Sequence, residues 1–459
     1  SYGLLNAVLT FVTGGSTCSD ESPVEYRFSW GDGTMSDWST ATNSHAWQSG
    51  GAFAVRAQAR SVTQPDRVSN WSAEKSLSIT SMPPVAATRY VSPTGGNVSP
   101  YTSWATAAHK IQDAIDVALN GAMVVVAPAT YTENITFRGK SIQVGSLFMT
   151  DGDTNYIGST VINGGAAGPV VSFTNSETAS ARLCGFTITN GLASGAWQRG
   201  GGVCCDHASP TLDHLIVSGN RASGTTAEGG GIYLQVSYAS VRHVVSRGNH
   251  ADHSAGGIRV SYGLPTFVNV VVENNTCNLG GGGMLIYHSS CTLRNVLIAN
   301  NTAFAGEGGG GVFLDGCSPL FENVTFVGNN AATGVGGGIN VSYYSSPMLL
   351  NCIAWDNTPE QISFNTAWSG MSITIEFSDI QGGYAGIVTR SKGPVYWGSG
   401  NLQVDPLFAG SGSYRLQSGS PCINTGSNQS WMTTEVDISG NSRIVNSVVD
   451  MGAFEFMPV

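Results

Sequence analysis

The chain has 459 residues and a formal net charge of −10, and 11% of its residues are charged, against roughly 25% in an average soluble protein. Clusters of Lys or Arg are few, so the chain lacks the basic stripe that a nucleic-acid partner requires. The longest apolar run, Ala122–Ala129, is interrupted by Pro128 and falls far short of the roughly 20 residues of a membrane span.

Residues 1–80 show short runs of alternating side chains between turn signals, which predicts a small β-domain. The run Tyr26–Trp30 leads into a Trp-Gly-Asp-Gly turn, and His45-Ala46-Trp47 and the long run Ala52–Arg60 follow it. This set of motifs resembles a PKD domain. The resemblance implies an immunoglobulin-like β-sandwich over residues 1–80.

In the PKD family an extra strand precedes the one that we predict at Asn6–Val12. The residues that remain for it are Ser1, Tyr2, Gly3, Leu4 and Leu5. The sandwich is therefore expected to have an open edge, where a strand from another copy of the chain can be added. The alternatives are that these few residues suffice for the strand or that the edge stays solvated.

Residues 81–86 contain two prolines and are predicted to be a linker. Beyond it, residues 104–120 carry apolar side chains at helical spacing, and Ser103 is placed to cap the helix that this spacing predicts. The apolar positions are Ile111, Ile115 and Leu119. One amphipathic helix ahead of a long β region is expected to cover the open end of a solenoid.

A repeat of 26 to 29 residues begins near residue 200. Each unit starts with a glycine before an apolar residue, and these glycines are Gly202, Gly231, Gly257, Gly283, Gly311 and Gly338. Each unit ends with an asparagine, and these are Asn220, Asn249, Asn275, Asn301, Asn329 and Asn357. Three short β segments lie between the glycine and the asparagine of each unit, and apolar side chains recur in them at every second residue. Each unit is therefore predicted to be one coil of a stacked solenoid. The closing asparagines are expected in the left-handed conformation that Asn tolerates.

Stacking of the coils places equivalent residues about 4.8 Å apart. In this register a second column of asparagines is predicted to form an amide ladder. The column consists of Asn269, Asn295, Asn323 and Asn351. Opposite charges also match between neighbouring coils, in three pairs: Asp213 with Arg242, Arg247 with Glu273, and Arg294 with Glu322.

The repeating units resemble the right-handed parallel β-helix superfamily, which includes pectate lyases and many secreted bacterial proteins. The resemblance covers roughly residues 87–395 and implies an all-β fold with three strands per coil. Downstream, Asp405–Phe408, Ser420–Ile423 and Val449–Glu455 resemble the closing module of large bacterial surface β-helix proteins. Residues 396–459 are therefore predicted to be a C-terminal capping module.

The nine cysteines include no Cys-x-x-Cys pair, which argues against a zinc site. Two of them, Cys205 and Cys352, fall on inward positions of the coils. Most of the thiols are therefore expected to be small buried core groups.

The β-helix superfamily implies two kinds of active site for cleaving acidic polysaccharides. A lyase needs a base with a group that neutralises the uronate, and a hydrolase needs two carboxylates about 5–9.5 Å apart. The motifs of polygalacturonases and the aspartate cluster of pectate lyases are both missing. The best catalytic candidates are Arg242, His243, His214 and Asp213, because stacking brings the two histidines together beside a carboxylate. The alternative is an ion pair and a His/Asn ladder without chemistry.

Residues Asp151, Asp153 and Asn155 have the D-x-D-x-N spacing of calcium loops, although the later Gly and Glu of an EF-hand are missing. The spacing predicts either a structural calcium ion or an ordinary polar loop. No other cofactor is expected.

One turn position of the coil carries aromatic side chains in several units. The candidate ligand-binding residues there are Tyr262, Tyr287, His288, Tyr343 and Tyr344. Such a column can stack sugar rings or face another copy of the protein. The alternative is that these aromatic residues cover the core.

Three functions remain open at this point. Low charge, regular coils and the missing catalytic constellation favour a non-enzymatic structural or adhesive surface protein, which assembles into fibres through its N-terminal domain. The others are a lyase or hydrolase acting on acidic glycans and a carbohydrate-binding protein. Expected partners are further copies of the chain, surface proteins or a polysaccharide. Because the first residue is Ser1 rather than Met, we expect an extracellular or cell-surface protein that has lost a signal peptide.

Overall fold

The structure is a computed structural model, which describes residues 2–80, 87–195, 199–410 and 412–458. Ser1 and the predicted linker 81–86 lie outside the described residues. The chain divides into two compact units, residues 1–85 and 86–459. In the part of the chain that is described, no helix has the length and apolar character needed to cross a membrane.

The N-terminal unit is a small β-sandwich. Its strands are β1 (Tyr2–Leu4), β2 (Leu9–Val12), β3 (Val24–Ser29), β4 (Thr42–His45), β5 (Gly51–Ser61) and β6 (Lys75–Thr80). One sheet has the order β1-β6-β5-β3, and β2 pairs with β4 in a second sheet. The sheets enclose a core that includes Phe28, Trp30 and Trp47. The Nε1–H group of Trp47 donates to the carbonyl oxygen of Trp30 over 3.1 Å, which satisfies the indole in the core.

The N-terminal residues occupy the edge that was expected to be open. Strand β1 runs parallel to β6, with Gly3 opposite Ile79. Three residues therefore suffice for the extra strand, which is one of the alternatives that the sequence left open, and the edge beside β6 is not vacant. Addition of a strand from another copy directly beside β6 would require β1 to leave it.

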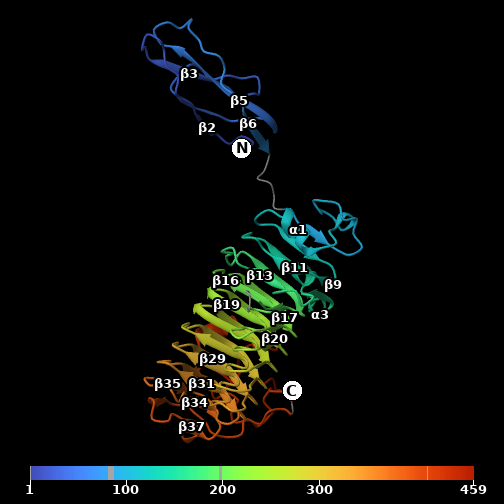
Figure 1. Cartoon of the computed structure of the whole chain (residues 1–459), viewed down its shortest axis with the longest axis vertical. Coiled ribbons are helices and arrows are strands. Elements are labelled where there is room, and N and C mark those ends of the chain that lie inside the picture. The colour runs from blue at the N-terminus through green and yellow to red at the C-terminus, as the bar shows by residue number, and fades with distance from the viewer. Residues whose placement is uncertain (1, 81–86, 196–198, 411, 459) are drawn as a thin grey trace. The chain divides into compact units, whose positions relative to one another are not determined.

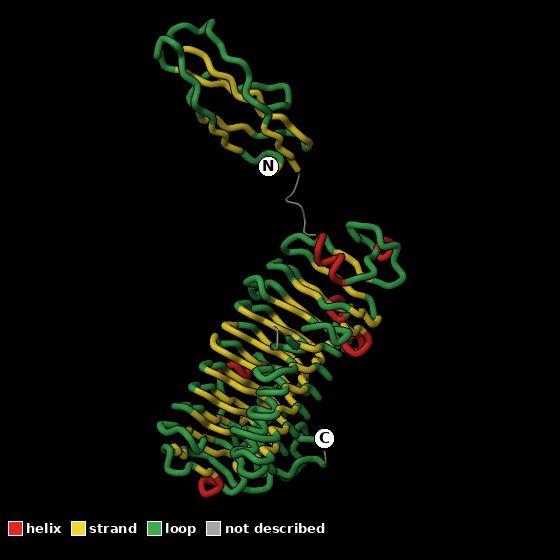
Figure 2. The backbone as a smooth tube through the Cα atoms, in the orientation of Figure 1, coloured by secondary structure: helices red, strands yellow, loops and turns green. Residues whose placement is uncertain are grey.

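The second unit is a parallel β-helix, in which strands from successive coils stack side by side (Figures 1 and 2). The first sheet contains β10 (Ile135–Thr136), β13 (Val171–Phe173), β16 (Val203–Asp206), β19 (Ile232–Ser237), β22 (Ile258–Gly263), β25 (Met284–Tyr287), β28 (Val312–Asp315), β31 (Ile339–Ser342), β34 (Ile362–Phe364) and β37 (Ile387–Val388). A short sheet contains β15 (Leu192–Ala193), β18 (Arg221–Ala222), β21 (His250–Ala251), β24 (Thr276–Cys277), β27 (Thr302–Ala303) and β30 (Asn330–Ala331).

The largest sheet runs the length of the β-helix. Its main path contains β7 (Arg89–Val91), β8 (Met123–Val126), β11 (Gln143–Ser146), β14 (Arg182–Thr189), β17 (Thr211–Ser218), β20 (Ser240–Arg247), β23 (Thr266–Glu273), β26 (Thr292–Ala299), β29 (Leu320–Val327), β32 (Met348–Leu350), β35 (Ile373–Glu376) and β38 (Val395–Trp397). Beside this path lie β9 (Ala129–Thr132), β12 (Thr160–Asn163), β33 (Ile353–Trp355) and β36 (Asp379–Ile380). The hairpin β39 (Ile444–Val445) and β40 (Val448–Val449) forms a separate pair.

Alternation of side chains fills the interior of the β-helix. One coil shows the pattern, since Ile258, Val260, Phe267, Val270 and Val272 are each at most 1% exposed. Equivalent residues of all coils join in one continuous core. Eight of the nine cysteines are buried and none is paired in a disulfide, so the prediction of buried thiols is confirmed.

The N-terminal end of the core is covered by a shorter helix than the sequence predicted. The segment folds into η1 (Trp104–Thr106), which Ser103 caps, and α1 (Ile111–Val117). The two are separated because Ala108 forms a β-bridge with Val91, which requires extended backbone. The other helical turns are α2 (Phe148–Asp151), α3 (Asn155–Ser159), η2 (Gly383–Gly386) and η3 (Ser430–Thr433).

The closing asparagines form a continuous buried ladder. Asn275 donates from its Nδ2 to the Oδ1 of Asn301 over 3.0 Å, and Asn301 donates to Asn329 over 2.9 Å. Their expected left-handed conformation was wrong, because the residue before each asparagine takes it instead. Those residues are Gly219, Gly248, Asn274, Asn300, Gly328 and Asp356.

The second asparagine column takes the left-handed conformation, and it forms its predicted ladder only in part. Asn351 donates to Asn323 over 3.2 Å, whereas Asn323 donates to the carbonyl oxygen of Asp450 over 2.9 Å. Asn295 likewise donates to the carbonyl oxygen of Val436 over 2.8 Å. The segment that was expected to cap the far end therefore packs along the flank of the coils.

The coil register agrees with the predicted alignment of charges, Arg247 with Glu273 included, but only one of the three predicted pairs is an ion pair among the described residues. Arg294 contacts Glu322 at 2.7 Å, which confirms that pair. Asp213 and Arg242 are register partners, yet Arg242 binds both carboxylate oxygens of Glu435 at 2.8 Å. The predicted Asp213–Arg242 ion pair was therefore wrong, because the C-terminal segment supplies another carboxylate.

Candidate functional site

The structure brings together three of the four predicted catalytic candidates. Asp213 and His214 lie on β17, and His243 lies on the neighbouring β20. His214 and His243 each come directly after one member of the register pair Asp213–Arg242. Their φ angles are 49° and 51°, so both have left-handed backbone. Arg242 points to the C-terminal segment and does not join the cluster.

Asp213 is the centre of this group, which we call the histidine cluster. Its Oδ1 accepts from the Nδ1 of His214 over 2.7 Å and lies 3.4 Å from the Nδ1 of His243. Its Oδ2 accepts from the Nη2 of Arg182 over 2.5 Å. Burial by itself raises the pKa of Asp213, but the hydrogen bonds from His214, His243 and Arg182 outweigh it and hold the pKa well below its usual range. Asp213 is therefore a permanent anion near neutral pH.

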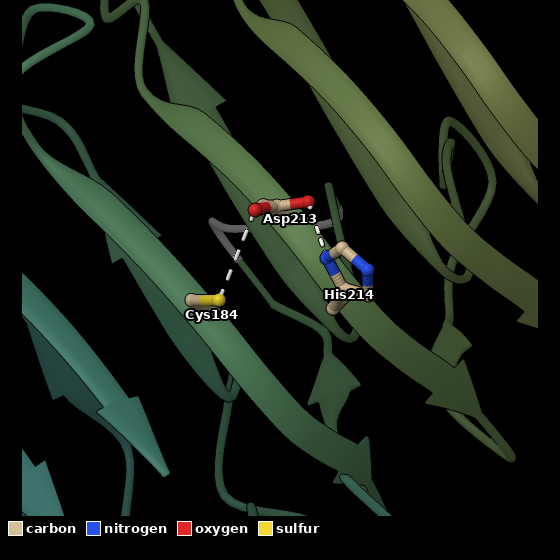
Figure 3. A group of neighbouring side chains, drawn as sticks. All are labelled: Cys184, Asp213 and His214. Atoms are coloured by element: carbon tan, nitrogen blue, oxygen red, sulfur yellow. Dashed lines mark hydrogen bonds and ion pairs between the residues drawn. The ribbon is translucent and has the colours of Figure 1, made fainter. Parts of the chain in front are cut away.

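Cys184 also belongs to the histidine cluster, and the sequence analysis missed it. It lies on β14 directly opposite Asp213, and its Sγ is 3.9 Å from the Oδ2 atom (Figure 3). Extending the coil register one unit upstream would have found it. Burial and the charge of Asp213 raise the pKa of the thiol to about 12. The thiol faces a carboxylate rather than an imidazole, so this geometry lacks the nucleophile–base contact of cysteine catalysis.

A pocket of about 430 Å³ adjoins the histidine cluster. His214 and His243 line one side, and Thr154, Asn155 and Gly158 line the other. The predicted calcium loop and the predicted catalytic histidines are therefore neighbours. The pocket leaves the histidines accessible to a small ligand.

The predicted calcium ligands lie where α2 ends and α3 begins, with Asp151 the last residue of α2, Asp153 in the connection and Asn155 the first residue of α3. Asp151 accepts from the backbone N–H of Asp153 over 3.0 Å, and Asp153 accepts from that of Asn155 over 2.9 Å. These bonds are typical of Asx turns, in which carboxylates cap the backbone. Calcium binding there stays a prediction.

The predicted ligand-binding residues form a second site, on the edge of the first sheet. Tyr262, His288, Tyr343 and Tyr344 all have positive φ angles between 40° and 56°, which turn their side chains outward beyond the strand ends. Tyr262 is 44% exposed and Tyr344 is 64% exposed. In the intervening coil Gly316 occupies this position, where a Cβ atom would lie 2.7 Å from the ring of His288.

These side chains contact one another in a continuous series, which we call the aromatic stripe. Tyr262 stacks on His288 with ring centroids 5.7 Å apart, and His288 lies 6.0 Å from Tyr343. Tyr343 contacts Tyr344 at 5.2 Å and Trp368 at 4.9 Å. The stripe consists of Tyr262, Tyr287, His288, Tyr343, Tyr344 and Trp368. Trp368 was missed because it lies in a turn outside the regular repeat.

A buried arginine and a half-buried carboxylate lie beside the aromatic stripe. The side chain of Arg259 is 7% exposed, bonds to Glu228 over 3.2 Å, and places its guanidinium carbon 5.1 Å from the ring of Tyr287. Its Nη1 group has no hydrogen-bond partner among the described residues. Asp315 pairs with Tyr287 in the strand register, and burial raises the pKa of its carboxyl group. The stripe thus combines ring faces with an unsatisfied donor and an acceptor.

Comparison with known proteins gives a family model and a solved structure. The model described as the right handed beta helix region matches residues 130–326. The crystal structure of pectate lyase Pel9A is similar with a TM-score of 0.44 and 16% identity, and covers 80% of this chain and 96% of that chain. No curated protein matches. The stacked parallel strands confirm the predicted β-helix fold, and residues 130–326 of it match the right-handed family model. The PKD and C-terminal resemblances stay predictions.

Proposed function

We propose that this chain is an exported, non-enzymatic adhesive protein that binds polysaccharide through the aromatic stripe. The single observation that carries the proposal is the connected series of exposed and half-buried rings along one edge of the β-helix. Sugar rings present apolar C–H faces that stack on aromatic side chains, and a row of rings can contact successive residues of one polymer. A β-helix holds such a row rigidly, which lowers the entropic cost of binding a chain molecule.

The preferred ligand is an uncharged glycan. The segments that carry the stripe, residues 261–265, 287–290, 342–346 and 365–370, contain no Lys or Arg. The positive charge of Arg259 is compensated by the ion pair with Glu228, and Asp315 adds a negative charge beside the stripe. A uronate carboxylate would therefore meet repulsion, whereas sugar hydroxyls can donate to Asp315.

The test is retention on polysaccharides by affinity electrophoresis. The variant carries Tyr262→Asn and Tyr343→Asn, because Asn tolerates the left-handed backbone of both positions. The matched control is Tyr384→Asn, which removes a tyrosine that is 58% exposed outside the stripe. We expect the double variant to bind a neutral glycan about tenfold or more weakly, and the control to bind as the wild type does.

Two results would contradict the proposal. Unchanged retention of the double variant would remove the stripe as the binding surface. Release of soluble uronate fragments from an acidic polymer would show the polysaccharide lyase or hydrolase that the sequence left open. Retention on acidic rather than neutral polymers would keep the stripe but overturn the choice of ligand.

A further inference from the structure

The histidine cluster holds four side chains with metal-binding atoms, and the aromatic stripe does not use them. They come from three adjacent strands, with Cys184 on β14, Asp213 and His214 on β17, and His243 on β20. Ligand atoms of the first three lie within 4.8 Å of one another (Figure 3). We propose that Cys184, Asp213, His214 and His243 bind a divalent cation of the zinc type.

The donor set fits zinc chemistry. One thiolate sulfur, two imidazole nitrogens and one carboxylate oxygen are the usual ligands of tetrahedral zinc, with bonds of about 2.0–2.3 Å. Such bonds separate neighbouring ligand atoms by roughly 3.3–3.8 Å. The His243 Nδ1–Asp213 Oδ1 distance of 3.4 Å is already in this range, and the Cys184 sulfur lies within 4.8 Å of the ligand atoms of Asp213 and His214. His214, now 2.7 Å from Asp213, would have to withdraw by less than about 1 Å.

The two histidines are not needed for the backbone conformation. Their left-handed turn position is filled in other coils by Gly185 and by asparagines. The C-terminal segment bonds to the asparagines at 295, 323 and 351, but His214 and His243 line the pocket of about 430 Å³. Imidazoles thus replace amides at two coils where a small ligand can enter.

Asn269 supplies independent support for a ligand. Its Nδ2 lies 3.1 Å from the Nε2 of His243, and its buried Oδ1 has no hydrogen-bond partner among the described residues. If the Asn269 amide rotates by half a turn, its Oδ1 accepts a hydrogen bond from the Nε2–H group of His243. This bond favours the tautomer of His243 in which Nδ1 carries no proton and can bind a metal. Arg182 meanwhile occupies Oδ2 of Asp213 and leaves Oδ1 for the ion. Both neighbours act as the outer hydrogen-bond partners that metal ligands usually have.

Binding balances with the release of one proton. The Cys184 thiol loses its proton to solvent as the sulfur–metal bond forms. Each neutral imidazole gives up its Nδ1 proton and takes one on Nε2 from solvent, so its own proton count does not change. No oxidant or reductant takes part. The Cys-x-x-Cys rule did not reveal this site, because its ligands lie on different coils and meet only through stacking.

The experiment titrates cobalt(II) into full-length, chelator-treated protein under reducing conditions. Cobalt(II) bound to a thiolate shows a charge-transfer absorption band, so the band reports on Cys184 without any activity assay. We expect one ion per chain, displacement by zinc, and loss of the band in Cys184→Ser. The control Cys18→Ser removes a partly exposed thiol of the N-terminal unit and should keep the band.

Two further variants separate ligand loss from misfolding. His214→Asn and His243→Asn install the residue that other coils carry at this position, so both should fold. We expect each to bind cobalt more than about tenfold more weakly, and zinc to raise the unfolding midpoint of the wild type but not of Cys184→Ser. A wild type without the band, or a band that survives in Cys184→Ser, would overturn the proposal.

Discussion

Asp379 shows how one buried carboxyl group makes stability depend on pH. The residue is fully buried, accepts from the backbone N–H of Val404 over 3.1 Å, and has the thiol of Cys422 at 3.3 Å. Burial raises the pKa of this carboxyl group to about 6, and the two hydrogen bonds offset only part of the effect. The folded state therefore binds the proton more tightly than the unfolded state, for which the ordinary value is 3.8.

This difference fixes the direction of the pH dependence. The contribution of Asp379 to the free energy of unfolding is fully present below pH 4 and is lost as the pH rises through about 6. The total loss is about 3 kcal/mol. We expect Asp379→Asn to be more stable than the wild type at pH 8 by up to that amount, and equal to it at pH 4. Urea unfolding at both pH values measures this, with the exposed Asp153→Asn as control. A variant less stable than the wild type at pH 8 would contradict the assignment.

The asparagines with left-handed backbone show which residue conformations could be predicted from the sequence and which could not. Left-handed backbone was predicted for the closing asparagines, which do not adopt it, and it was not predicted for the second column, which does. A closing asparagine bonds instead to the next coil, as in the 3.0 Å contact from the Nδ2 of Asn249 to the Oδ1 of Asn275. Propensity alone does not separate the two roles, because Asn tolerates positive φ and also satisfies buried backbone groups.

At the scale of the element, the C-terminal segment binds the flank of the β-helix through asparagine side chains. Asn323 is fully buried and donates to the carbonyl oxygens of Asp450 and Gly452 over 2.9 and 3.3 Å. In return, the backbone N–H of Gly452 donates to the carbonyl oxygen of Asn351 over 2.7 Å. These contacts join residues more than 100 positions apart. They carry no periodic signal in the sequence, so these flank contacts could not be predicted from it, and the capping role of residues 396–459 stays a prediction.

Replacement of Asn323 by Gly should loosen this segment while the coils stay intact. Glycine keeps the backbone conformation at φ 55° but removes the amide. Loss of a buried hydrogen-bond donor costs about 1–3 kcal/mol, so amide exchange in residues 449–455 should become roughly 5- to 150-fold faster. Hydrogen exchange followed by mass spectrometry measures this. The control Asn190→Gly changes an exposed left-handed residue elsewhere and should leave that segment unaffected. Equal exchange in Asn323→Gly and wild type would show that the amide does not hold the segment.

At the scale of the whole molecule, the repeat predicted the β-helix because stacking makes every coil obey the same pattern. The spacing of 26 to 29 residues places each inward side chain over its equivalent in the next coil. The repeat predicted the histidine cluster only in part. Cys184 and Arg182 lie in the coil before the first regular repeat, so the sequence alignment of the coils did not include them. The aromatic stripe was predicted except for Trp368, which lies in an irregular turn. Regular positions are thus readable from the sequence, whereas contacts across irregular turns require the structure.

The two units have separate hydrophobic cores, and this predicts separate unfolding. The core around Trp30 and Trp47 shares no residue with the core of the β-helix. Trp47 is fully buried, so Trp47→Ala should destabilise the N-terminal unit by about 3–5 kcal/mol through the cavity that it leaves. Calorimetry should show one transition moved to lower temperature and the β-helix transition shifted by less than about 2 °C. If both transitions move together, the two units unfold as one cooperative body despite their separate cores.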